Sequence, residues 1–90
     1  MAQAVVDPGE LRRFAHALRL FTGDLRADLA TIQTQLRALG DSWRDQEHEH
    51  FTQEFEQTVR VVEKFLDIAE EHVPFLNRKA ERIEEYLHQR

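Results

Sequence analysis

Cysteine is absent from the 90-residue sequence. The chain therefore has neither a disulfide framework nor thiol chemistry, and its redox compartment is left open. No apolar run approaches the roughly 20 residues of a membrane-spanning helix, and Met1 to Val6 is too short and uncharged for a cleaved signal peptide. We therefore expect no membrane insertion, and any export would follow a route that reads another signal.

Positive charge is scarce and unevenly placed. The net charge is -5, and residues 41–74 carry three basic and ten acidic side chains, against five basic and four acidic in residues 1–40. Affinity for nucleic acid comes mainly from clustered Lys and Arg. We therefore expect no nucleic-acid partner.

Groups for catalysis are also missing. The sequence has no nucleophile with a base and an orienting acid and no glycine-rich phosphate loop. Glu47 and His50 have the i, i+3 spacing of di-iron four-helix bundles, but the first half of the chain offers only Glu10, at its very start, as a further glutamate. His50 and Glu54 are more simply an i, i+4 pair on a solvated face. We expect no enzyme activity, no metal and no cofactor.

Two long helical patterns fill the chain and predict a single all-α domain over residues 1–90, built as an antiparallel hairpin. The first helix is predicted over 8–39, because Asp7 can cap it, Pro8 suits the first helical position, and apolar residues follow in steps of three and four. Residues 40–42 are the predicted turn, in which Gly40 adopts a left-handed conformation. Either Ser42 or Asp45 is expected to cap the next helix. The second helix is predicted over 43–87.

Pro74 is the one obstruction in the second helix. Proline removes a backbone donor and crowds the preceding turn, so we expect a kink or a break there. Counting back from the turn puts Pro74 level with Pro8. The apolar stripe of residues 75–87 would then extend past the start of the first helix. That segment either folds back as a third short helix or packs on another molecule.

The apolar faces are wider than one hairpin seam needs, which predicts that two hairpins pair into a four-helix-bundle dimer. The alternative is a lone hairpin that leaves some apolar surface exposed, as monomers do. The residues predicted to pack in a dimer or in the overhang are Leu20, Val61, Phe65, Ile68, Leu76, Ile83 and Leu87.

The turn carries a recognisable motif. Trp43 is the only tryptophan, Phe51 follows it by eight residues, and Phe55 lies one helical turn further on. In length, helix pattern and this spacing the chain resembles the WXG superfamily, small helical hairpins that are substrates of type VII (ESX-like) secretion. The departure is Asp45, which stands where the Trp-x-Gly motif has glycine. Trp43 is either a plug that closes the hairpin end or an exposed recognition element.

The resemblance implies a non-enzymatic protein that is secreted without a cleaved signal peptide. Its partners would be a second copy, as a homodimer, or a paralogous hairpin, together with a secretion ATPase. The family's Tyr-x-x-x-Asp/Glu tail is not matched, because Tyr86 is followed four positions later by Arg90. A co-exported partner would then carry that signal. The alternative is a cytoplasmic interaction or adaptor module that is not exported.

Overall fold

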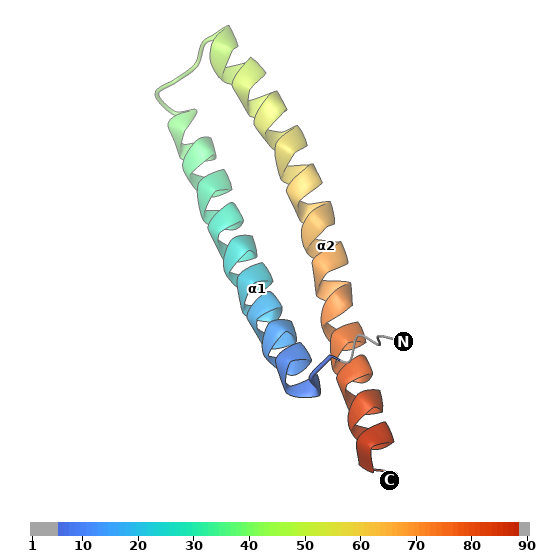
Figure 1. The fold of residues 1–90 in the computed structure, drawn as a ribbon. Coiled ribbons are helices and arrows are strands. Elements are labelled where there is room, and N and C mark those ends of the chain that lie inside the picture. Colours follow the sequence, from blue (N-terminus) through green and yellow to red (C-terminus); the bar gives the residue numbers. More distant parts are fainter. Residues whose placement is uncertain (1–5, 89–90) are drawn as a thin grey trace.

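The computed structural model describes residues 6–88 as two antiparallel α-helices joined by a short turn (Figure 1). Helix α1 spans Pro8–Leu39 and helix α2 spans Gln46–His88. The molecule is a rod of 69 × 24 × 15 Å, and no strand occurs in the described part. Neither helix is long and apolar enough to cross a membrane. The predicted all-α hairpin is confirmed.

The two ends of α1 are built in different ways. At the start, the Asp7 carboxylate accepts a hydrogen bond of 2.8 Å from the Gly9 amide, and Pro8 occupies the first turn, as the sequence indicated. At the end, Gly40 has φ -62° and ψ -17°, so the predicted left-handed conformation is wrong. Gly40 instead keeps a right-handed helical conformation. The turn after it is closed by a hydrogen bond from the Trp43 amide to the Leu39 carbonyl at 2.9 Å.

Helix α2 continues through Pro74 without a break. The alternatives of a broken helix and of a third helix folding back are therefore wrong. Figure 1 shows the C-terminal part of α2 running on in the same direction beside the start of α1. Proline cannot donate a backbone hydrogen bond at this point. The packing of α2 against α1 before and after Pro74 offsets the free energy that this missing hydrogen bond costs.

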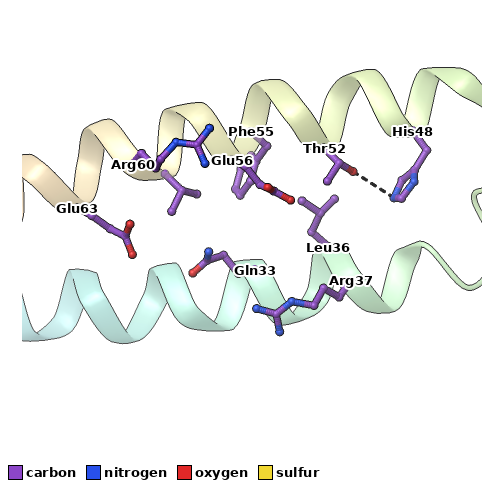
Figure 2. Close-up of a pocket in the computed structure, with 10 residues that line it drawn as sticks. Gln33, Leu36, Arg37, His48, Thr52, Phe55, Glu56, Arg60 and Glu63 are labelled. Atoms are coloured by element: carbon purple, nitrogen blue, oxygen red, sulfur yellow. Dashed lines mark hydrogen bonds between the residues drawn. The ribbon is translucent and has the colours of Figure 1, made fainter.

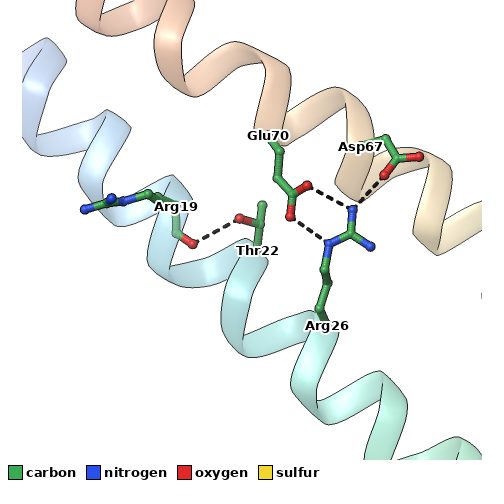
Figure 3. Close-up of polar contacts among 5 residues, drawn as sticks. All are labelled: Arg19, Thr22, Arg26, Asp67 and Glu70. Atoms are coloured by element: carbon green, nitrogen blue, oxygen red, sulfur yellow. Dashed lines mark hydrogen bonds and ion pairs between the residues drawn. The ribbon is translucent and has the colours of Figure 1, made fainter.

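Ion pairs on one flank fix the register of the two helices. The Arg26 guanidinium binds Glu70 through Nε at 2.7 Å and Nη2 at 3.0 Å, and its Nη2 also reaches Asp67 at 2.7 Å (Figure 3). Arg12 binds Glu84. Both steps, from Arg26 to Arg12 and from Glu70 to Glu84, cover fourteen residues. The hydrogen bonds to Arg26 lower the pKa of Glu70, which therefore stays ionised at neutral pH.

The observed register differs from the one counted back from the turn. The residues on either side of Pro74, Val73 and Asn77, line a hollow together with Ala15 and His16, so Pro74 lies beside the early turns of α1 but not level with Pro8. The turn occupies residues 40–45 rather than 40–42, and α2 begins beyond the end of α1 (Figure 1). The stretch from residue 75 to Glu84 therefore lies mostly beside α1, so the predicted overhang is much shorter than expected.

The core between the helices is thin. Its buried hydrophobic residues are Ala15, Val59, Leu66, Ala69 and Ala80. Among the described residues, only Leu66 and Thr22 are large and fully buried, and the Thr22 hydroxyl is satisfied by the Arg19 carbonyl at 3.0 Å (Figure 3). Many of the large apolar side chains are therefore exposed. Where such side chains form a large patch on a monomer, the patch often marks an interaction site.

Candidate functional site at the hairpin turn

The start of α2 is set by Asp45. Its Oδ1 accepts a hydrogen bond of 3.0 Å from the His48 amide, and its carbonyl oxygen accepts from the His48 and Glu49 amides at 3.1 and 3.4 Å. Of the two residues that could cap α2, Asp45 does so, and the Ser42 hydroxyl donates to the Leu39 carbonyl instead. The aspartate at the glycine position of the motif is thus the N-cap of α2. The helix therefore begins at Gln46 and not at residue 43, where the sequence predicted its start.

The cap contributes to stability in a way that substitution can measure. We expect Asp45→Ala to lower the free energy of unfolding by about 1 kcal/mol, because the His48 amide loses its side-chain acceptor. Asp45→Asn keeps an acceptor oxygen and is the matched control, with an expected change of no more than a few tenths of a kcal/mol. Urea unfolding followed by circular dichroism measures both. A loss in Asp45→Asn equal to that in Asp45→Ala would show that charge, not capping, matters.

Trp43, Phe51 and Phe55 form a row of aromatic rings along the turn end of the hairpin. The ring centroids of Trp43 and Phe51 are 6.0 Å apart at an interplanar angle of 37°, and those of Phe51 and Phe55 are 5.9 Å apart at 28°. Trp43 and Phe55 are half-buried and Phe51 is exposed. Such pairs contribute about 0.5–1.5 kcal/mol each beyond the area they bury. The structure thus brings together the three aromatic residues of the turn that the sequence singled out, and Asp45, the fourth, caps the helix that carries Phe51 and Phe55.

One side of this row borders a surface hollow of about 480 Å³, which we call the outer hollow. Its lining residues are Trp43, Gln46, Glu47, His50, Phe51 and Glu54. His50 Nε2 lies 2.7 Å from the Glu54 carboxylate, and both side chains are well exposed, as expected for an i, i+4 pair on a solvated face. Among the described residues, no group of three or more acidic, His or Cys side chains could hold a metal ion.

His48 is the turn residue that sequence reasoning missed. Its ring packs edge-on to the Trp43 indole, with centroids 4.9 Å apart and an interplanar angle of 63°. It also borders a second hollow of about 470 Å³ between the helices, the inner groove, whose other lining residues include Leu36, Arg37, Thr52 and Val59 (Figure 2). No sequence signal marked it, because the backbone conformation of Gly40, which does not require glycine, is seen only in the structure.

Away from the turn, exposed apolar side chains gather on the flank opposite the ion pairs. A groove of about 350 Å³ there is lined by Phe14, Leu18, Phe65, Ile68, Ala69, His72, Phe75 and Leu76. Steps of seven and eleven residues keep the same face of a helix, so Phe21 and Ile32 extend this surface along α1, and Val61 extends it along α2. We call these eleven residues the apolar flank.

The residues predicted to pack in a dimer or overhang fall into three groups. Val61, Phe65, Ile68 and Leu76 belong to the apolar flank, while Ile83 is half-buried and Leu87 exposed near the open end of the hairpin. Leu20 is exposed but lies elsewhere, because it follows Leu18 of the apolar flank by two positions, which correspond to about 200° around a helix. It faces away from α2.

Comparison with known proteins gives both a family and a fold. A family model described as "Proteins of 100 residues with WXG" matches residues 3–86. The crystal structure of the secreted protein EsxB from Bacillus anthracis str. Sterne superposes with a TM-score of 0.78 at 23% identity, covering 93% of this chain and 97% of that chain. A proline-to-alanine variant of EsxB gives 0.82 at 22% identity, covering 94% and 96%. No curated protein matches the chain.

Proposed function

The chain belongs to the WXG100 family of hundred-residue WXG proteins, and from this premise we propose that it is a type VII (ESX-like) secretion substrate or the carrier half of an exported pair. The observation that carries the proposal is the aromatic row at the hairpin turn, with Trp43 half-buried against Phe51. The EsxB neighbours, which share the fold, are described as secreted proteins. No part of this role calls for catalysis.

The proposed partner is a second hairpin, either another copy of the chain or a paralogue. The core buries few large side chains, while the apolar flank leaves Phe14, Phe65 and Phe75 about half exposed. A second hairpin laid along this flank would complete a four-helix bundle and remove those rings from water. The ion-paired flank around Arg26 would remain outside, in contact with solvent.

The proposed destination is outside the cell, reached without a cleaved signal peptide and through a secretion ATPase. The surface that such a machine would recognise is the turn end, where Trp43 and Phe51 border the outer hollow. A half-buried tryptophan suits this role, because part of the indole stabilises the turn while the rest stays accessible.

Export of a Trp43→Ala variant tests this proposal. We expect the wild-type protein in culture supernatant only when the secretion ATPase is present, and we expect Trp43→Ala to remain in the cells. Its thermal midpoint should fall by only a few degrees, roughly what the loss of about 1 kcal/mol of ring contacts produces. Leu20→Ala, which removes an exposed side chain far from the turn, should be exported normally. Equal export of wild type and Trp43→Ala would remove the proposed role of the turn.

The competing function is a cytoplasmic interaction or adaptor module. One sequence feature favours it, since Tyr86 is followed four positions later by Arg90 and not by an acidic residue. The same assay distinguishes the two functions. A protein that stays in the cells with and without the ATPase, even when a paralogous hairpin is co-expressed, would support the adaptor.

A further inference from the structure

The His48 side chain connects three parts of the turn. Its ring meets the Trp43 indole edge-on at 4.9 Å between centroids. Its Nε2 lies 3.4 Å from the Thr52 hydroxyl, one turn along α2 (Figure 2). Its backbone amide is held by Asp45, so the base of the side chain is fixed as well. His48 is only half-buried, yet little of its conformational freedom remains.

Gly40 provides the space for this ring at the end of α1. Its φ and ψ of -62° and -17° are accessible to any residue, so the backbone does not require glycine. A Cβ placed on Gly40 would lie 3.3 Å from His48 Cε1 and 3.2 Å from the Arg37 carbonyl oxygen. Both of these contacts are tighter than ordinary van der Waals packing. The His48 ring is therefore one of two neighbours, with the Arg37 carbonyl, that a side chain at position 40 would crowd.

We propose that His48 is a positioning residue for Trp43, and that its ring, seated against Gly40, holds the indole beside Phe51 so that the outer hollow keeps its shape. This inference rests on the proposed function in one respect, because it assigns a purpose to the orientation of Trp43. The packing itself is independent of export. The His48 ring contacts the hairpin turn at Trp43 and the start of α2 at Thr52, and it lies against Gly40 at the end of α1.

The arrangement explains why the indole needs such a support. The ring contact with Phe51 has centroids 6.0 Å apart and a tilt of 37°, so Phe51 alone leaves the indole free to rotate about its side-chain bonds. The His48 ring lies on the side of the indole away from the outer hollow, since His48 borders the inner groove and Trp43 does not. Without His48, the indole has room to turn toward the inner groove.

A double-mutant cycle on Gly40 and His48 tests the contact. Gly40→Ala should change the folding equilibrium constant more favourably in a His48→Ala background than with His48 present, by roughly two- to five-fold, because the contact of the new methyl group with the ring is then absent. The contact with the Arg37 carbonyl is common to both backgrounds and cancels in the cycle. An equal effect of Gly40→Ala in both backgrounds would overturn the proposal.

Trp43 itself reports the positioning, because it is the only tryptophan in the chain. We expect His48→Ala to lower the steady-state fluorescence anisotropy of Trp43 and to increase its quenching by acrylamide, with the helix content unchanged. His48→Phe keeps an aromatic ring at this position and should restore both readings. Thr52→Val removes only the hydroxyl near Nε2 and should resemble wild type. The proposal would be overturned if the Trp43 anisotropy of His48→Ala equalled that of wild type. It would also be overturned if Thr52→Val lowered the anisotropy as much as His48→Ala does.

Export of the same variants separates this inference from the proposed function. If both hold, His48→Ala should be exported less than wild type, and His48→Phe should be exported normally. If His48→Ala frees the indole but leaves export unchanged, the positioning role stands and the proposed recognition of the turn fails. If the indole is unaffected while export of Trp43→Ala is lost, the positioning role fails and the recognition of Trp43 stands.

Discussion

Replacing Leu66 by alanine is expected to lower the free energy of unfolding by about 2–5 kcal/mol, the largest stability effect that we anticipate for a single substitution. Leu66 is fully buried, and the other buried hydrophobic positions are one valine and three alanines. The two helices have few other side chains to close a cavity at this point. Since small domains are stable by only 5–15 kcal/mol, such a loss would leave the hairpin close to unfolding at 37 °C.

Leu20→Ala is the matched control for this experiment, because it removes the same atoms from a side chain that is 54% exposed. Its cost should stay within about 0.5 kcal/mol, since surface substitutions away from caps and cores are nearly neutral. Both variants should be unfolded in urea at the same protein concentration, because any self-association makes stability depend on concentration. Similar losses in the two variants would mean that the hairpin has no specific core between its helices.

The sequence predicts the helices well because their signals are local. A cap, a proline and a step of three or four residues each act within one or two turns, so Asp7 and Pro8 mark the start of α1 correctly. The turn was harder to predict for the same reason. Gly40 has a right-handed backbone, and a side chain there would crowd both the Arg37 carbonyl and a ring that lies eight residues further along the chain.

The register of α1 against α2 and the unbroken course of α2 through Pro74 both depend on packing between the helices. A periodic pattern in the sequence does not describe that packing. The count from the turn placed Pro74 beside Pro8, whereas the hollow that Val73 and Asn77 line with Ala15 and His16 places it further along α1. The shift arises because the turn is three residues longer than predicted and α2 begins beyond the end of α1. Of the two outcomes expected at Pro74, a kink or a break, the break did not occur, because tertiary contacts along α1 outweigh the local cost of proline.

The turn site was only partly predictable. The spacing of Phe51 and Phe55 places them on one side of α2 by helix geometry alone, and both lie in the row with Trp43. His48 has no periodic partner and no motif of its own, so its contact with Trp43 could only be seen in three dimensions. Leu20 was included among the packing residues because it widens the apolar face of the first helix, and it lies outside the apolar flank. Its packing against a partner stays a prediction.

Replacing Phe65 by glutamate is expected to abolish pairing of the hairpin with a second copy. Phe65 is 51% exposed and lines the groove of the apolar flank with Phe14 and Ile68. If a second hairpin covers this groove, a glutamate at position 65 must be buried without a partner or must leave a gap in the interface. A central aromatic of this kind typically contributes about 2–4 kcal/mol, which corresponds to a rise in Kd of roughly 30- to 1000-fold.

Light scattering after size-exclusion chromatography measures this effect, with Leu20→Glu as the control. Leu20 is exposed to nearly the same extent as Phe65 but lies outside the apolar flank, so Leu20→Glu should remain dimeric. If both variants dissociate equally, the partner also contacts the back of α1, as the sequence first suggested. If the wild type is monomeric but assembles with a co-expressed paralogue, the flank serves a heterodimer, and Phe65→Glu should prevent that assembly instead. A wild type that remains alone under both conditions would show that the apolar flank has no hairpin partner.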